Sequence, residues 1–415
     1  MASRMKTLLL TNEYPPSTYG GAGVHVDYLS RELAKLIDVE VRTFGSQDET
    51  LAGGRLRVRG FPEETAGHNA PKPLRSVFAA AARAVAWNSA GIDADLVHCH
   101  TWYTHLGGII AKLNYGLPLV ITVHSLEPLR PWKREQLAGG YDFSCWVEKT
   151  AIEMADAVIA VSRETKADIL RLFDIEESRV PIIYNGIDPA EYLPAEPGDP
   201  RVRGVLEREG INPALPYVLF VGRIARQKGI VHLVNAIKYL DPGFQIVLCA
   251  GAPDTPEIAA EMKAAVDAAK REHDGIIWIE RMVDKPTVLA LYAGAAVFCC
   301  PSIYEPFGII NLEAMACETA VVASAVGGIK EVVVDGETGI LVPLEQMQQS
   351  PFEAADPDRF ARDLAAAINR LMADAPLRDR MAKAGRKRSV EMFSWAAIAE
   401  QTRELYARLL ASEQS

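Results

Sequence analysis

Two successive series of short apolar segments, each alternating with helical patterns, constrain the fold of this chain more than any other feature. In the first series the apolar segments cover residues 7–11, 39–44, 96–100, 119–124, 157–162 and 180–184. They are apolar on consecutive residues, which is typical of strands buried on both faces. Helical periodicity lies between them, over residues 24–37, 75–90 and 147–155. The series predicts a doubly wound parallel sheet with helices on both faces.

A second series starts at Tyr217 and reads YVLFVG, QIVLCAG, IIWIE, VFCCPS, AVVAS and GILVP. Residues 185–216, between the two series, hold six prolines and predict a linker with little regular structure. A chain of 415 residues also exceeds the usual size of one hydrophobic core. We therefore expect two Rossmann-like domains, residues 1–186 and 187–394. The amphipathic helix over 395–415 is expected to pack back on the first.

Composition excludes several classes of protein. Asp and Glu number 54 against 44 Lys and Arg, and the formal charge of −10 argues against a nucleic-acid binder. The six cysteines form no CxxC pair and predict reduced thiols, as in a cytoplasmic protein. Since no apolar run reaches the roughly 20 residues of a membrane span, no membrane partner is expected. The oligomeric state stays open, a homo-oligomer being one option.

Two glutamates point to a ligand with hydroxyl groups. Glu305 follows the apolar run that ends at Cys300, and Glu313 comes eight positions later, in the helix that the pattern predicts. The carboxyl ends of parallel strands, where helix N-termini also converge, are the usual ligand site of such sheets. One carboxylate could bind sugar hydroxyls and the other a second diol, which predicts a sugar nucleotide.

Cations and glycines that could hold a phosphate follow two other strands. Arg223 and Lys228 lie five apart in GRIARQKG, after YVLFV, and both could reach one pyrophosphate. A solvated surface is the alternative for such a pair. In the first half Gly20, Gly21 and Gly23 precede a helix, where backbone N–H groups could approach a phosphate. This glycine loop is neither a dinucleotide fingerprint nor a Walker motif, and a flexible turn is its alternative.

Histidines end two strands of the first half. His124 follows LPLVITV, where it could hydrogen-bond a sugar hydroxyl or carry a proton. His100 ends LVHCH and is nearer the sheet edge than His98. A structural role is the alternative for both. No metal site is expected: the spacing of His98, Cys99 and His100 does not suit zinc, and Asp93-Ala94-Asp95 precedes its strand and is taken as a turn.

The motifs YGGAG, HSLEP, VGRIARQKG and YEPFGIINLEA, in this order, closely resemble retaining glycosyltransferases of family four, which have the GT-B fold. Within the family, EYPPSTYGGAGVHV, HTWY, HSLEPLRPWK and VVASAVGGIKEVVVDGETG look most like bacterial glycogen synthases of the actinobacterial type, including the α-maltose-1-phosphate synthases. The resemblance covers essentially the whole chain. It implies two Rossmann-like domains facing a central cleft. A departure is Thr101, which stands where related synthases often have an aspartate.

The resemblance also implies roles for single residues. ADP-glucose would be the donor, with Arg223 and Lys228 on its diphosphate, Glu305 on the glucose hydroxyls and Glu313 on the ribose. The backbone N–H groups of Phe307, Gly308, Ile309 and Ile310 would cover the sugar and the distal phosphate, and Gly20 to Gly23 would approach from the other domain. His124 would contact the transferred glucose. The usual mechanism of the family needs neither a metal nor another cofactor.

The expected reaction is retaining transfer of glucose from ADP-glucose to a 4-hydroxyl, either of a glucan end or of α-glucose 1-phosphate. Arg130, Lys133 and Arg134 follow His124, and such a cationic loop suits an acceptor phosphate. His100 is the other candidate on the acceptor side. Same-face attack is favoured over a covalent intermediate because no motif supplies a nucleophile. Alternatives are a family-four enzyme that uses a UDP-sugar with a phosphorylated small-molecule or lipid acceptor, and a non-catalytic sugar-nucleotide-binding protein.

Overall fold

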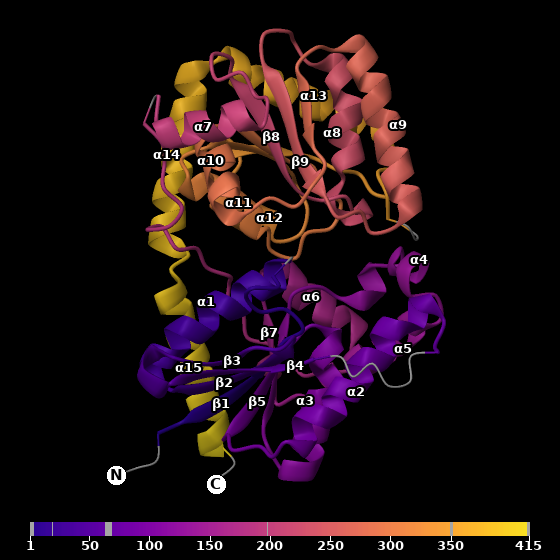
Figure 1. The fold of residues 1–415 in the computed structure, drawn as a ribbon, viewed down its shortest axis with the longest axis vertical. Helices are drawn as coiled ribbons and strands as arrows, with labels where there is room; N and C mark the ends of the chain where they lie inside the picture. Colours follow the sequence, from indigo (N-terminus) through magenta and orange to yellow (C-terminus); the bar gives the residue numbers. More distant parts are fainter. Residues whose placement is uncertain (1–3, 19, 63–68, 197, 349–351, 413–415) are drawn as a thin grey trace. The chain divides into compact units, whose positions relative to one another are not determined.

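A computed structural model describes residues 4–18, 20–62, 69–196, 198–348 and 352–412 of the chain. The chain divides into two compact units. Unit 1 combines Met1–Gly186 with Trp395–Ser415, and unit 2 is Ile187–Ser394. Each unit has a largely parallel sheet between layers of helices (Figure 1). The predicted fold class, two doubly wound α/β domains, is confirmed.

The sheet of unit 1 has the strand order β3-β4-β2-β1-β5-β6-β7. The strands are β1 (Lys6–Leu10), β2 (Asp38–Phe44), β3 (Asp48–Leu51), β4 (Leu56–Phe61), β5 (Leu96–His100), β6 (Leu119–Val123) and β7 (Ala157–Ala160). All neighbours pair in parallel except β3, which runs antiparallel to β4 at the sheet edge. The order reverses between β1 and β5, and in open α/β sheets such a switch point is where ligands bind.

Helices cover both faces of this sheet. The helices of unit 1 are α1 (Gly21–Leu36), α2 (Arg75–Ser89), α3 (Trp102–Tyr115), α4 (Lys133–Leu137), α5 (Gly140–Met154), α6 (Arg163–Leu172) and α15 (Trp395–Ser412). Side chains of α1 and α15 share one core with alternate residues of the strands, such as Leu9 and Val39. Leu8 and Leu10 face the other way, into a core with α2, α3, α5 and α6. Burial on both faces explains the continuously apolar strands.

Unit 2 repeats this architecture with the strand order β10-β9-β8-β11-β12-β13, all in parallel. Its strands are β8 (Tyr217–Arg223), β9 (Gln245–Gly251), β10 (Ile276–Ile279), β11 (Val297–Cys300), β12 (Ala320–Ser324) and β13 (Gly339–Val342). The switch point lies between β8 and β11. The helices are α7 (Pro200–Arg208), α8 (Ile230–Ala236), α9 (Pro256–Glu272), α10 (Lys285–Gly294), α11 (Ile309–Ala316), α12 (Ile329–Val332), α13 (Pro357–Ala373) and α14 (Ala375–Met392).

Three local expectations are wrong. Residues 180–184 form no strand; Ile182 makes only an isolated bridge to Ala160, because Pro181, inside this short segment, has no backbone N–H to extend the pairing. The proline-rich linker contains α7, in which Pro200 occupies the first turn and Asp199 caps the helix by accepting the N–H of Arg201. Strands β3 and β4 were not predicted, since their polar alternation lacks the apolar run of the buried strands.

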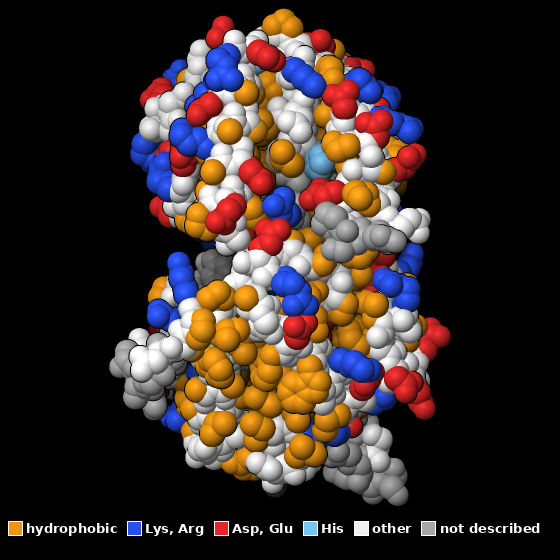
Figure 2. All heavy atoms as spheres, turned by 90° about the vertical axis from the view of Figure 1, so that its right-hand side faces the viewer, with side chains coloured by type: hydrophobic (Ala, Val, Ile, Leu, Met, Phe, Trp, Pro, Cys, Tyr) orange, Lys and Arg blue, Asp and Glu red, His pale blue; other side chains and the backbone are white. Residues whose placement is uncertain are grey.

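The cysteines are free thiols, and all except the partly buried Cys145 are buried. Among the helices that the structure describes, none combines the length and the apolar character needed to cross a bilayer. Figure 2 shows hydrophobic side chains gathered on one face of unit 1. Phe78 and Val85 of α2 and Trp146 of α5 are among the exposed large hydrophobic residues.

Candidate functional site

The polar groups predicted to hold the donor follow the two strands that flank the switch point of unit 2. Arg223 ends β8, and Lys228 lies in the short 3-10 turn after it. Glu305 follows β11. Backbone bonds join the two loops, since the N–H of Ile303 donates to the carbonyl of Gln227 at 2.9 Å. The parallel pairing of β8 with β11 therefore brings side chains about 80 residues apart in the chain to one edge.

Lys228 and Glu305 are in direct contact. The Nζ of Lys228 lies 2.6 Å from Oε2 of Glu305, and the side chains are 17% and 11% exposed. The hydroxyl of Ser302 also donates to this carboxylate, at 3.4 Å. A partly buried ion pair is less screened by water than a surface pair. These contacts thus hold both side chains in place at this edge of the sheet.

Arg223 contacts an aspartate that sequence reasoning missed. Its Nη1 lies 2.6 Å from Oδ1 of Asp254, whose side chain is 5% exposed. Asp254 follows β9, the neighbour of β8, so the rule that picked out the other residues could have found it. Asp254 therefore orients a guanidinium at the same edge as Lys228.

Glycines allow the loops around Glu305 to pack closely. Gly229 has φ +60, and a Cβ there would lie 2.0 Å from the carbonyl oxygen of Pro301. Gly327 has φ +51, and its Cβ would lie 2.0 Å from the carbonyl oxygen of Glu305. The N–H of Gly328 donates to that same carbonyl at 3.0 Å. The backbone at Glu305 is thus fixed by contacts that only glycine permits.

Helix α11 begins beside Glu305. Phe307 is buried, Gly308 is the N-cap with φ +95, and Ile309 and Ile310 open the helix. The first N–H groups of a helix lack intrahelical acceptors and attract anions. Glu305 and this helix start therefore share one local region of unit 2, as the sequence predicted for the sugar and the distal phosphate.

Glu313 lies further along α11 and is held by two tyrosines. The hydroxyl of Tyr192 donates to Oε1 at 2.7 Å, and that of Tyr292 donates to Oε2 at 3.0 Å. Burial raises the pKa of Glu313 above its ordinary value, and the two hydroxyls oppose this rise. Because a carboxylate has about four acceptor positions, these bonds leave capacity for a ribose diol. Neither tyrosine gave a sequence signal.

In unit 1 the predicted histidines meet. His100 ends β5 and His124 follows β6, its neighbour in the sheet. Nδ1 of His100 lies 3.0 Å from Nε2 of His124, so one of the two rings donates to the other. Burial, together with neighbouring imidazoles, lowers the pKa of both far below the ordinary value. At neutral pH His124 is therefore an uncharged hydrogen-bonding group rather than a charged acid.

Thr101, the departure from the related synthases, follows His100 in an uncommon conformation. Its φ is +69, which few β-branched residues adopt. Its hydroxyl donates to Oδ1 of Asn12 at 2.7 Å, from the loop after β1. Strain of this kind, worth about 1 to 3 kcal/mol, is concentrated at functional sites. The switch point of unit 1 is thus a constrained loop pair next to the two histidines.

Arg130 and Lys133 belong to a buried ion cluster around Glu127. Oε1 of Glu127 lies 2.9 Å from Nζ of Lys133 and 3.5 Å from Nη1 of Arg130. Burial alone would raise the pKa of Glu127, but the two cations outweigh burial, and the pKa is lowered. At neighbouring Glu148, burial raises the pKa well above its ordinary value. The cluster therefore gathers two basic side chains, Arg130 and Lys133, around the carboxylate of Glu127, with Glu148 beside it.

Arg134 differs from these two cations, although the sequence grouped the three. Its side chain is 53% exposed, and its Nη1 lies 3.0 Å from Oδ2 of Asp142. It is therefore an ordinary surface ion pair.

The glycine loop of unit 1 is arranged around Glu13, which the sequence did not single out. The N–H of Gly20, the N-cap of α1, donates to Oε2 of Glu13 at 2.7 Å. A Cβ on Gly23 would lie 2.8 Å from Cβ of Glu13. One N–H expected to face a phosphate is thus already bonded to a carboxylate, while Gly21 begins the helix.

Two other features lie outside this chemistry. Asp95 accepts a hydrogen bond from the backbone N–H of Lys6, and Asp93 accepts one from the Nζ of Lys6. Both are 2.7 Å long and lie at the edge where β1 and β5 begin.

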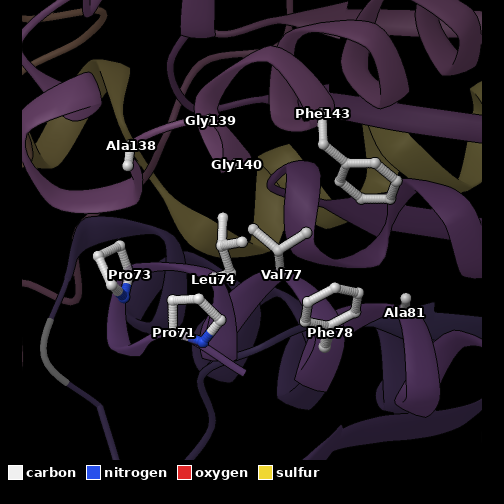
Figure 3. A pocket seen from close by; sticks show the side chains of 10 residues that line it. All are labelled: Pro71, Pro73, Leu74, Val77, Phe78, Ala81, Ala138, Gly139, Gly140 and Phe143. Atoms are coloured by element: carbon white, nitrogen blue, oxygen red, sulfur yellow. The ribbon is translucent and has the colours of Figure 1, made fainter. Parts of the chain in front are cut away.

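A cavity of about 500 Å³ in unit 1 is lined by apolar side chains and glycines (Figure 3): Pro71, Pro73, Leu74, Val77, Phe78, Ala81, Ala138, Gly139, Gly140 and Phe143. Without polar groups to orient a ligand, this cavity does not suit a sugar.

Comparison with known proteins agrees with this geometry. Residues 19–191 match the family model Glycosyltransferase Family 4, and residues 206–351 match Glycosyl transferases group 1. The chain is 48% identical over 417 residues to α-maltose-1-phosphate synthase of Mycolicibacterium smegmatis, with 98% of this chain and 100% of that protein covered. It is 31% identical to D-inositol 3-phosphate glycosyltransferase of Xylanimonas cellulosilytica, with 94% of this chain and 92% of that protein covered.

A similar solved structure is sucrose-phosphate synthase from Thermosynechococcus elongatus. The TM-score is 0.80 at 26% identity, with 99% of this chain and 100% of that chain covered. The catalytic domain of starch synthase IV from Arabidopsis thaliana has a TM-score of 0.71 at 20% identity, with 99% of this chain and 100% of that chain covered. This match shows a likeness of fold.

Proposed function

Because the chain belongs to glycosyltransferase family 4, we propose that it transfers glucose from ADP-glucose, with retention, to the 4-hydroxyl of α-glucose 1-phosphate, giving α-maltose 1-phosphate. The observation that carries the choice of acceptor is the gathering of Arg130 and Lys133 around Glu127, three residues after His124. An anionic acceptor is better matched to such a cluster than a neutral glucan end. The α-maltose-1-phosphate synthases, 46–48% identical to this chain, and a D-inositol 3-phosphate glycosyltransferase support a phosphorylated acceptor.

In this proposal unit 2 binds the donor. Arg223 and Lys228 bind the diphosphate and neutralise the charge that develops on it, and Glu305 binds glucose hydroxyls. The first N–H groups of α11, at Phe307 to Ile310, cover the sugar and the distal phosphate, and Glu313 takes the ribose. The loop at Gly20 to Gly23 contributes from unit 1. Stabilisation of the leaving group by fixed charges is the largest expected contribution to the rate.

Unit 1 supplies the acceptor side. Arg130 and Lys133 hold the acceptor phosphate, His100 contacts the acceptor, and neutral His124 bonds a hydroxyl of the transferred glucose. The bond from C1 to the diphosphate oxygen breaks as the acceptor 4-oxygen forms a bond to C1 on the same face. The proton of the 4-hydroxyl passes to the departing diphosphate oxygen. This route needs no protein nucleophile and no metal ion, and it leaves ADP and an α-linked product.

A glucan end is the second candidate acceptor. Glycogen synthase of Mycobacterium tuberculosis, 29% identical over 97% of this chain, favours it. Nucleotide release should be measured with ADP-, UDP- and GDP-glucose against glucose 1-phosphate and a maltooligosaccharide, with NMR analysis of the product anomer. We expect ADP-glucose with glucose 1-phosphate to be fastest and the product to be α-linked. Preference for the maltooligosaccharide would refute the proposed acceptor, and a β-linked product would refute retention.

The role of the cationic loop has a matched control. Arg130→Ala should raise the KM for glucose 1-phosphate by about tenfold or more, as expected for loss of a charge-assisted hydrogen bond. Arg134→Ala removes an exposed arginine of the adjoining helix α4 and should leave this KM unchanged. Equal effects of the two substitutions would show that the loop does not select the phosphate.

A further inference from the structure

Unit 1 buries a cluster of imidazoles that the proposed reaction only partly uses. His25 lies in α1, His100 ends β5 and His124 follows β6. One ring nitrogen from each of the three lies within 4.8 Å of the other two. The ring centroid of His25 is 4.7 Å from that of His124 and 5.3 Å from that of His100. Three nitrogens from separate elements thus converge on one point.

The hydrogen bond of His25 to Asn185 leaves the other ring nitrogen of His25 unprotonated. Its Nδ1 lies 2.6 Å from the amide oxygen of Asn185, which can only accept, so Nδ1 carries the proton and Nε2 does not. Among the residues that the structure describes, Nε2 of His25 and Nε2 of His100 are buried and have no hydrogen-bond partner. Orphaned buried polar atoms call for an explanation. The ring nitrogens of His232 are orphaned as well, but His25, His100 and His124 are the described group close enough to share a metal ion.

The arrangement at His25 is that of a metal ligand. A histidine that binds a metal with one nitrogen usually donates its other N–H to a carbonyl or carboxylate oxygen, which fixes the tautomer. Asn185 supplies such an oxygen.

We propose that His25, His100 and His124 form a binding site for one transition-metal cation of the Zn²⁺ class, and that its occupancy blocks glucosyl transfer. Three imidazoles with an open fourth position are a common zinc ligand set, and imidazole also suits Cu²⁺ and Ni²⁺. In a tetrahedral site, metal–nitrogen bonds of about 2.0 to 2.1 Å place the ligand nitrogens about 3.4 Å apart. Since the three nitrogens lie within 4.8 Å of one another, the rings need to close by up to about 1.4 Å to bind one ion.

The ligand set is all nitrogen. Cys99, between two histidines of β5, belongs to the core on the other face of the sheet with Leu8 and Leu10, and burial raises its pKa to about 12. It is therefore a thiol, whereas metals bind the thiolate.

The inhibitory effect rests on the proposed function, which assigns His100 and His124 to the sugars. Metal binding itself rests on the cluster alone.

Binding is tested on the full chain by optical titration with Co²⁺ after removal of metals with a chelator. We expect one Co²⁺ per chain, the visible bands of a tetrahedral nitrogen site, and no thiolate charge-transfer band. His25→Gln and His124→Ala should each abolish the bands, while Asn185→Ala should weaken binding by about tenfold, as for loss of an outer-shell partner. His232→Gln, which removes a buried histidine of unit 2, and Cys145→Ser should bind as the unmodified chain does.

Failure of the unmodified chain to bind Co²⁺ or Zn²⁺, or equal binding by either histidine variant when circular dichroism shows it folded, would refute the site. A rise in Tm with Zn²⁺ in the unmodified chain but not in the folded His25→Gln protein supports it independently.

The inhibitory effect is measured as nucleotide release with and without Zn²⁺. We expect Zn²⁺ to abolish transfer and a chelator to restore it, whereas His25→Gln keeps its chelated rate and loses sensitivity to the metal. Transfer that Zn²⁺ leaves unchanged in a metal-bound chain would refute inhibition. If no donor and acceptor pair reacts, the proposed function fails, and the Co²⁺ spectrum still decides the site.

Discussion

The ammonium group of Lys228 is 2.6 Å from a carboxylate oxygen of Glu305, although the two residues follow different strands of unit 2. In the proposed donor site these groups bind neighbouring parts of one ligand, the diphosphate and the glucose. Their mutual contact holds both side chains in place before the donor arrives. Such preorganisation lowers the cost of ordering side chains on binding.

Lys228→Met should lower kcat/KM for ADP-glucose by roughly 10²- to 10³-fold, because a fixed positive charge on the leaving diphosphate is lost. It also leaves Glu305 without its cation. Steady-state kinetics measure the loss, and Lys263→Met, on an exposed part of α9, is the control. A decrease below threefold, on the order of 0.6 kcal/mol, would remove Lys228 from the proposed chemistry.

Asp254→Asn should weaken donor binding while leaving the fold intact. The amide keeps the size of the carboxylate but removes the charge that orients Arg223, whose Nη1 is 2.6 Å away. We expect the KM for ADP-glucose to rise about tenfold, equivalent to about 1.4 kcal/mol. Unchanged donor kinetics would mean that Arg223 is positioned without Asp254.

Gly229→Ala should damage the donor loops more than a comparable glycine substitution elsewhere. Both Gly229 and Gly336 have positive φ, but a Cβ on Gly229 meets the Pro301 carbonyl at 2.0 Å, whereas one on Gly336 meets nothing within 4 Å. Gly336→Ala should cost only the backbone strain of about 1 to 2 kcal/mol. Denaturant unfolding should show a larger loss for Gly229→Ala, together with a higher donor KM; equal losses would contradict the predicted clash.

Acid should destabilise unit 1 below pH 6.5. Its described histidines His25, His98, His100, His105 and His124 all have pKa values lowered chiefly by burial. A lowered histidine pKa means that the unfolded chain binds more protons, so stability is lost as pH falls through 6.5 towards the folded-state pKa. His25 alone, with a folded-state pKa of about 4, lowers the free energy of unfolding by about 3 kcal/mol at pH 4 relative to neutral pH.

Glu148 acts in the opposite direction, since burial raises its pKa and its protonation favours the folded state at low pH. Thermal unfolding between pH 4 and 7 measures the sum of these opposing contributions to stability. We expect the contribution of the histidines to be the larger. His105→Gln should flatten the dependence of Tm on pH, as should His25→Gln. An unchanged slope in both variants would assign the acid sensitivity to other groups.

The sequence by itself determined the fold class and pointed to the residues on the donor side. Continuously apolar strands require burial on both faces, and polar residues after such strands necessarily lie along one edge of a parallel sheet. These are local patterns, and they singled out Arg223, Lys228, Glu305 and His124 as candidates without knowledge of the strand order.

Only the tertiary structure decided the partners of those residues. Lys228 meets Glu305 because β8 pairs with β11, and Tyr192 reaches Glu313 across 121 positions of the chain. His25 and Asn185 are 160 positions apart, and nothing local to either indicates their hydrogen bond. Periodicity and composition act over a few residues, whereas strand order and packing bring distant side chains together, so local patterns set the elements and the fold set the contacts.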